Sequence, residues 1–316
     1  MVQQNSFRGV SVENQDKRKK KNQNLMKIVK ALHNLTIHED LQRQRCSQEN
    51  IGKLLGTKSK KATYTEFAVD TISCEWVRPV KPHKTSDMIL YCHGGGFYTG
   101  SLKYARIVTT KLALSAPMDV LSFNYRLAPE HPAPAALEDT LKVWNHLMHL
   151  GYNAKNITVC GDSAGGNLAL ALGLKLKEEE QPLPRSFVLF SPWTDLTLTS
   201  SSKTQNAKPD PILTMKYLMS AREAYEPNGI FEETVYKNPY VSPLFGDYKA
   251  FSPVYIQVGS NEILLDDSTN LYEKLSKQLV PVKIDIYEGM WHVFQMCNMK
   301  IANEAICKAA QFIVDA

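Results

Sequence analysis

The sequence predicts an α/β fold in which a mostly parallel β-sheet is covered by helices on both faces. The chain has 316 residues, 43% hydrophobic and 22% charged, which is enough to bury a full core without a disulfide or metal. From residue 88 onward, short apolar runs alternate with segments of helical period, a pattern typical of parallel strands joined by helices. The predicted strands are 88–92, 120–125, 157–160, 187–190, 254–258 and 282–287, and the predicted helices are 103–114, 135–150, 164–177, 268–279 and 301–314.

The remaining segments complete the expected organisation. Residues 1–24 are polar and basic and should form a flexible tail, while 25–60 should form an N-terminal cap region that begins with a helix at 25–35. The alternation in 63–78 predicts a β-hairpin that opens the main domain, 61–316. The interval of about 196–250 lacks a strand pattern and contains helical pieces near 215–225. Together with the cap region, this insertion is expected to cover a pocket.

Charge and cysteine usage exclude several classes of protein. The net charge is +5, and the basic run at 17–21 alone supplies five positive charges, so nucleic acid is not an expected partner. No run approaches the roughly 20 apolar residues that span a bilayer, so neither stable membrane insertion nor a signal peptide is expected. The six cysteines form no CxxC pair, which predicts no metal site, and six free thiols fit a reducing, cytoplasmic location.

The strongest chemical signal is the hexapeptide GDSAGG at 161–166. It follows the predicted strand 157–160 and opens an Ala- and Leu-rich helix, which is the context required for a GxSxG nucleophile elbow. The glycines on either side of the serine permit a tight and strained turn. Ser163 is therefore the candidate nucleophile.

A second signal is the tetrapeptide HGGG at 93–96, directly after the predicted strand 88–92. Consecutive glycines leave backbone N–H groups free to face a ligand oxygen. In acyl transfer those of Gly95 and Gly96, with that of Ala164 after the nucleophile, would form an oxyanion hole. Gly94 completes the candidate set.

These motifs resemble the hormone-sensitive-lipase-like family of α/β-hydrolases, the bacterial family IV esterases. The resemblance also includes YRLAPEHP at 125–132 and SPWTDL at 191–196. It implies an α/β-hydrolase fold with a small helical cap. It further implies that His93 anchors its loop rather than acting as a base, and that Arg126 and Glu130 are structural.

The catalytic base and acid are expected late in the chain, because this fold orders its triad Ser, acid, His. His292 follows the last predicted strand and matches the catalytic position of the family, although the family more often has Gly where Val293 stands. Glu262 stands where the family usually has Asp, and Glu is an accepted alternative. Asp266 is the rival acid, although its place at the start of a helix is typical of a cap.

The expected activity is hydrolysis of carboxylic esters with short to medium acyl chains, through an acyl-enzyme, and this mechanism needs no cofactor. Two segments, NEILLDD at 261–267 and WHVFQ at 291–295, are also similar to monoterpene ε-lactone hydrolases, which leaves a lactone substrate open. A ligand-binding receptor on the same scaffold is the alternative of another class, and the presence of His292 weighs against it. Phe97, Tyr98 and Trp193 are candidate pocket residues. The sequence leaves a homodimer open.

Overall fold

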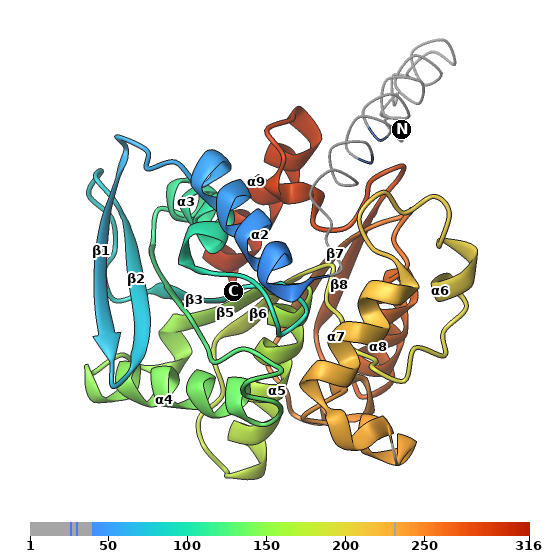
Figure 1. The fold of residues 1–316 in the computed structure, drawn as a ribbon. Coiled ribbons are helices and arrows are strands. Elements are labelled where there is room, and N and C mark those ends of the chain that lie inside the picture. Colours follow the sequence, from blue (N-terminus) through green and yellow to red (C-terminus); the bar gives the residue numbers. More distant parts are fainter. Residues whose placement is uncertain (1–25, 27–29, 31–39, 231) are drawn as a thin grey trace, which may run out of the picture.

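The structure is a computed structural model that describes residues 26, 30, 40–230 and 232–316 (Figure 1). The predicted tail, 1–24, and almost all of the predicted helix 25–35 lie outside the described residues. No helix within the described part of the chain is long and apolar enough to cross a membrane.

One eight-stranded sheet runs through the described residues in the order β1-β2-β4-β3-β5-β6-β7-β8. The pairings of β1 with β2 and of β2 with β4 are antiparallel, and the other neighbours pair in parallel. This confirms the mostly parallel sheet and the N-terminal hairpin. The strands are β1 (Ala62–Val69), β2 (Ile72–Pro79), β3 (Met88–Cys92), β4 (Asp119–Phe123), β5 (Ile157–Asp162), β6 (Ser186–Phe190), β7 (Val254–Gly259) and β8 (Val282–Tyr287).

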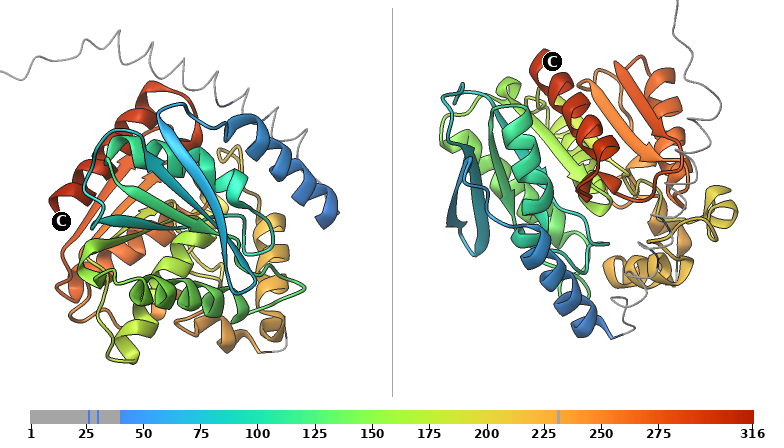
Figure 2. Two further views of the ribbon diagram at one scale, coloured as in Figure 1. Left: turned by 90° about the vertical axis from the view of Figure 1, so that its left-hand side faces the viewer. Right: turned by 90° about the horizontal axis from the view of Figure 1, so that it is seen from above.

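Helices cover both faces of the sheet, as predicted (Figure 2). Successive side chains of a strand point to opposite faces, and β3 shows this plainly. Leu90 lies in the core cluster shared with α4, α5 and α8, whereas Ile89 lies in the cluster shared with α3 and α9. These helices are α3 (Leu102–Ser115), α4 (Ala135–His149), α5 (Ala164–Glu178), α8 (Leu265–Lys277) and α9 (Lys300–Asp315).

Two segments lie outside this layered body. The described part of the interval 196–250 has no strand, as expected, and carries α6 (Ser202–Gln205), α7 (Met215–Tyr225) and the short 3-10 helices Pro227–Ile230, Glu233–Lys237 and Pro243–Phe245. The cap region contributes α2 (Leu41–Leu55). Its N-cap residue is Asp40, whose side chain accepts a hydrogen bond from the N–H of Arg43. Figure 1 shows α2 beside α3, and α6 and α7 at the opposite side of the molecule from β1.

Candidate active site

The predicted nucleophile lies in the sharp turn between β5 and α5. Ser163 has φ 53° and ψ −121°, a strained conformation, and its N–H donates to the carbonyl of Phe190 at 2.9 Å. A Cβ at Gly165 would overlap the carbonyl oxygen of Cys92, so only glycine allows α5 to approach β3 this closely. The side chain of Ser163 lies at the carboxyl end of the sheet, and 7% of the residue is exposed.

The glycine loop after β3 presents two unpaired donors. Gly95 and Gly96 have φ values of 117° and 62°, which L side chains rarely adopt. Among the described residues no acceptor pairs with their N–H groups, nor with that of Ala164, which is the first residue of α5. These are the three N–H groups that the oxyanion prediction requires.

Gly94 does not fit the predicted oxyanion hole. Its N–H donates to Oδ1 of Asp162 at 2.9 Å, and the hydroxyl of Tyr91 donates to the same oxygen at 2.6 Å. The hydrogen bond anchors the first glycine of the loop to the residue before the nucleophile. The Gly94 N–H is therefore engaged, and the candidate hole is reduced to Gly95, Gly96 and Ala164.

His93 is placed as an anchor, in line with the resemblance. Its ring stacks on Tyr125 with centroids 4.3 Å apart, and its Nδ1 lies 2.8 Å from the carbonyl oxygen of Gly94. Burial lowers the pKa of His93 to about 4, so this imidazole is neutral at pH 7. It has neither the position nor the charge behaviour of a base for Ser163.

Glu262 and His292 form a buried pair between the ends of β7 and β8. Nδ1 of His292 lies 2.9 Å from Oε2 of Glu262, whose side chain is fully buried. The other carboxylate oxygen, Oε1, accepts from the N–H of Gly259 at 2.5 Å and from the hydroxyl of Ser191 at 2.7 Å. These three contacts hold the carboxylate in place, and the contact at Nδ1 orients the imidazole so that Nε2 is its other, unbonded nitrogen among the described residues.

The hydroxyl of Ser163 is not hydrogen-bonded to this pair among the described residues. Ser163 and His292 are 7% and 8% exposed, so each keeps only a small surface that faces solvent. A loose contact between nucleophile and base is common in enzymes without bound substrate.

Asp266 is bound elsewhere. Its carboxylate accepts from the hydroxyl of Ser201 and from the N–H of Ser202, both at 2.8 Å. The residue at the N-cap of α8 is Leu264, and no side chain caps that helix. The prediction that Asp266 caps its own helix was therefore wrong, because its carboxylate instead binds the start of α6.

Three carboxylates set the charge around His292. Burial disfavours the imidazolium, but the hydrogen bond and charge of Glu262, with the charges of Asp210 and Asp162, outweigh it and raise the pKa of His292 above 6.5. Asp210 comes from the insertion and accepts from three backbone N–H groups, including that of Ile263 at 2.9 Å. Burial raises the pKa of Asp210 and of Asp162 to about 6. Above pH 6 both are anionic, and both favour a proton on His292.

A cavity of about 200 Å³ adjoins His292. Its walls come from α2, from α3, from the insertion and from the turn after β8. The lining residues are Gln44, Ser47, Gln48, Ile51, Leu55, Tyr104, Ile107, Ile212, Trp291, His292, Val293, Met296 and Cys297.

The predicted aromatic pocket residues do not line this cavity. Phe97 is fully buried and stacks on Tyr225 with centroids 3.8 Å apart. The indole N–H of Trp193 donates to the carbonyl of Asp195 at 3.1 Å, and Tyr98 contacts Tyr217. All three belong to the large core cluster, which is where their size and apolar surface are used.

Arg45 joins helix α2 of the cap region to the loops around the site by hydrogen bonds. Its guanidinium donates twice to Glu130 at 2.7 Å, and also to the carbonyls of Tyr98 and Ala128 at 2.8 Å. Arg126 in turn binds Asp139 on α4. Arg126 and Glu130 therefore make the structural contacts that the resemblance implies, and Glu130 reaches α2.

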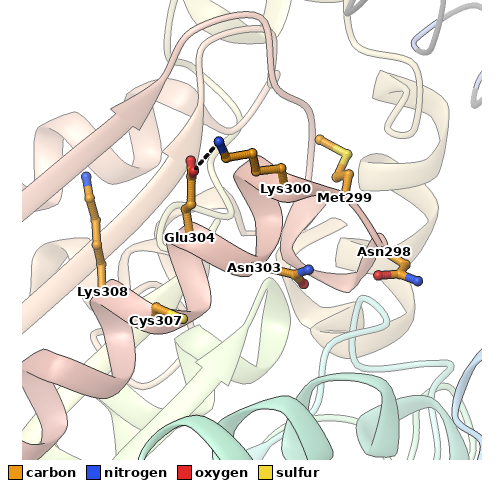
Figure 3. A pocket seen from close by; sticks show the side chains of 7 residues that line it. All are labelled: Asn298, Met299, Lys300, Asn303, Glu304, Cys307 and Lys308. Atoms are coloured by element: carbon orange, nitrogen blue, oxygen red, sulfur yellow. Dashed lines mark ion pairs between the residues drawn. The ribbon is translucent and has the colours of Figure 1, made fainter.

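A larger open hollow, about 710 Å³, lies along α9 (Figure 3). The figure shows Lys300 paired with Glu304, and Cys307 and Lys308 one turn farther along the helix. No candidate catalytic residue lines it. In the described part of the chain no cluster of His, Cys, Asp and Glu could hold a metal ion.

Sequence reasoning missed several residues at the site. Ser191 was noted only as the first residue of the SPWTDL motif, with no role predicted for it. Asp210 precedes a proline in a segment without a recognised pattern. Helix α2 lies within the predicted helical cap region, 25–60, but its bounds were not predicted because residues 41–55 are largely polar, although Asp40 is a typical N-cap residue. Only the fold brings these residues to His292.

Comparison with known proteins places this geometry in a family. The alpha/beta hydrolase fold family matches residues 89–296. An esterase from Acinetobacter venetianus is 41% identical over 229 residues, covering 72% of this chain and 74% of that protein. An acetyl-hydrolase from Streptomyces hygroscopicus is 35% identical over 222 residues, covering 70% and 72%.

Solved structures of similar proteins point to the same family as the sequence comparisons. An esterase from the bacterial hormone-sensitive lipase (HSL) family superposes with a TM-score of 0.86 at 29% identity, covering 94% of this chain and 98% of that one. A hormone-sensitive lipase from a metagenome library gives 0.86 at 31% identity, covering 93% and 97%. The chain therefore belongs to the α/β-hydrolase fold family and, within it, to the carboxylesterases that resemble hormone-sensitive lipase.

Proposed function

We propose that the protein hydrolyses carboxylic esters through Ser163 as nucleophile, His292 as base and Glu262 as the acid that orients the base. The observation that carries the proposal is the 2.9 Å contact between Glu262 Oε2 and His292 Nδ1, in a pair with 0% and 7% exposed side chains, beside the nucleophile elbow. A carboxylate at Nδ1 holds the tautomer in which Nε2 can accept a proton.

The chemistry follows in two steps. Nε2 of His292 takes the proton of Ser163 while Oγ attacks the ester carbonyl, and the N–H groups of Gly95, Gly96 and Ala164 bind the oxyanion. The imidazolium then gives its proton to the departing alcohol, which leaves an acyl-enzyme. Water, deprotonated by the same imidazole, attacks the acyl group, and the carboxylic acid and free Ser163 are released.

The substrates are esters with short to medium acyl chains. The support is the family to which the chain belongs, in which the similar proteins are named esterase and acetyl-hydrolase. A similar protein is named an acetyl-hydrolase, which agrees with small acyl groups. An ε-lactone would be opened by the same steps and remains the second candidate, resting on the sequence similarity at 261–267 and 291–295.

A panel of substrates tests this proposal. Initial rates on p-nitrophenyl acetate, butyrate, octanoate and palmitate should be highest for the shorter chains, and ε-caprolactone is compared with ethyl hexanoate. Ser163→Ala should lose essentially all turnover while its far-UV circular dichroism stays unchanged. Retained turnover in Ser163→Ala, or a preference for palmitate, would contradict the proposal.

The receptor alternative is disfavoured by the same pair of residues. A binding protein has no need of a fully buried glutamate held on an imidazole beside a strained serine. A cytoplasmic location and a homodimer stay predictions. The cysteines of the described residues are all unpaired, as a reducing compartment requires.

A further inference from the structure

Val293, the residue after His292, holds a backbone conformation that is unfavourable for its side chain. Its φ and ψ are 47° and 42°, in the left-handed region. A β-branched residue is a genuine outlier there, whereas glycine adopts this region freely. The conformation is maintained by two hydrogen bonds, from the Val293 N–H to Ser191 Oγ at 3.2 Å and from the N–H of Met296 to the Val293 carbonyl at 3.1 Å.

The side chain is buried without belonging to the core. Val293 is 5% exposed, yet it is in none of the three apolar clusters of the described residues, although its neighbours Trp291 and Phe294 are in one. It lines the cavity of about 200 Å³ beside His292. The isopropyl group is therefore a wall of that cavity, retained at a position where the backbone favours having no side chain.

The cavity lies on the alcohol side of the scissile bond. This step rests on the proposed function, in which His292 protonates the departing alcohol. A general acid must be within hydrogen-bond distance of the oxygen that it protonates. A cavity lined by His292 itself, by Val293 and by Ile51 of α2 is therefore next to the alcohol carbon.

We propose that Val293 sets the size of the alkyl alcohol that the enzyme accepts, and that among alkyl esters its substrates are those of small, unbranched primary alcohols. The walls formed by Ile51, Leu55, Ile107 and Val293 suit a straight alkyl group, whereas the secondary carbon of a cyclohexyl group would meet the isopropyl group. A p-nitrophenyl ester does not report on this cavity, because p-nitrophenolate leaves without a proton from His292. The acyl group lies on the other side of the ester carbonyl, so the choice of acyl chain does not depend on Val293.

The experiment varies one half of the ester at a time. Hydrolysis of ethyl, butyl and cyclohexyl acetate is followed by acid release in a pH-stat, which needs no chromogenic alcohol. Val293→Ala should raise the ratio of kcat/KM for cyclohexyl over ethyl acetate by about tenfold, the scale of a methylene-sized change in an apolar pocket. Val293→Leu, which fills the cavity further, should lower the ratio of butyl over ethyl acetate.

Two comparisons make the result specific. Val280→Ala removes the same groups from a valine with the same 5% exposure in the main core, and should leave the alcohol ratios unchanged. The ratio of ethyl hexanoate over ethyl acetate should be the same in the wild-type enzyme and both Val293 variants. If Val293→Ala does not fold, Val293→Leu alone decides.

The outcomes separate the two proposals. Alcohol ratios that do not move in active Val293 variants, or acyl ratios that move instead, overturn the role of Val293 and leave the triad untouched. A wild-type enzyme that hydrolyses neither series would overturn the proposed function and this inference with it.

Discussion

Removing the hydroxyl of Ser191 should damage both the stability and the chemistry of the site. Ser191 is fully buried and lies at the end of β6 with φ 48°. Its Oγ donates to Glu262 Oε1 at 2.7 Å and accepts from the N–H of Val293 at 3.2 Å. One hydroxyl therefore joins Glu262, the proposed triad acid, to the turn that carries His292.

The size of the effect follows from these two contacts. A hydrogen bond to a charged group contributes about 1.5–3 kcal/mol, and a neutral one contributes about 1 kcal/mol. Ser191→Ala should therefore lower the free energy of unfolding by about 3 kcal/mol, measured by urea titration with circular dichroism. Because Glu262 keeps its contact with Gly259, the carboxylate stays but is less well aimed, and kcat/KM on p-nitrophenyl butyrate should fall by about ten- to a hundredfold.

Two variants show whether the hydroxyl or the backbone is responsible. Ser191→Gly also lacks the hydroxyl but suits a positive φ, so it should be more stable than Ser191→Ala by about 1 kcal/mol and equally impaired in catalysis. Ser186→Ala removes another fully buried hydroxyl, one that pairs with Thr158 at 2.9 Å away from the triad, and should keep normal kinetics. Wild-type kinetics in Ser191→Gly would refute the reasoning.

Two further predictions concern the acid and the base. Glu262→Gln should lower kcat by roughly 10⁴-fold, the scale known for loss of a triad carboxylate, while Asp266→Asn should stay within about threefold of wild type. Steady-state rates of the two variants test this, and the reverse order of effects would assign the acid to Asp266. Because the pKa of His292 is raised and the base must be neutral, kcat/KM should fall with decreasing pH at a midpoint above 6.5. Asp210→Asn removes one of the charges that raise this pKa, so the midpoint should move to lower pH; a midpoint that moves upward would contradict the assignment.

The layered fold was predictable because its signals are local. Apolar runs such as 88–92 and 282–287 match the strands residue for residue, and the order of strands and helices predicts a parallel sheet. The elbow and the late histidine were also readable, because this fold places them at strand ends in a fixed order.

The contacts around these residues were not readable, because they join segments far apart in the sequence. Asp162 binds Gly94, Asp210 binds Ile263, and Arg45 binds Glu130, and no local pattern records these pairs. Aromatic neighbours of a motif were equally ambiguous: Phe97 stands beside the glycine loop in sequence, but its ring lies in the core.

Strained backbone also occurs at the site in a way the sequence conceals. Ser163, Ser191 and Val293 have positive φ and follow the ends of parallel strands, and they are three of the nine described non-glycine residues with positive φ. Non-glycine residues in this region cost on the order of 1–2 kcal/mol each. Such strain persists only where the surrounding contacts hold it, and at the site the hydrogen bonds of Ser163, Ser191 and Val293 do so.

The central claim, that Ser163 carries the acyl group, is tested most directly by trapping the intermediate. The enzyme is mixed with p-nitrophenyl butyrate, quenched in acid during turnover, digested, and mapped by mass spectrometry. We predict a butyryl group on Ser163 of the wild-type enzyme and none in Ser163→Ala. If His292→Ala slows deacylation more than acylation, that variant should show a larger trapped fraction. A butyryl group on another residue, or turnover in the Ser163→Ala enzyme, would contradict the account.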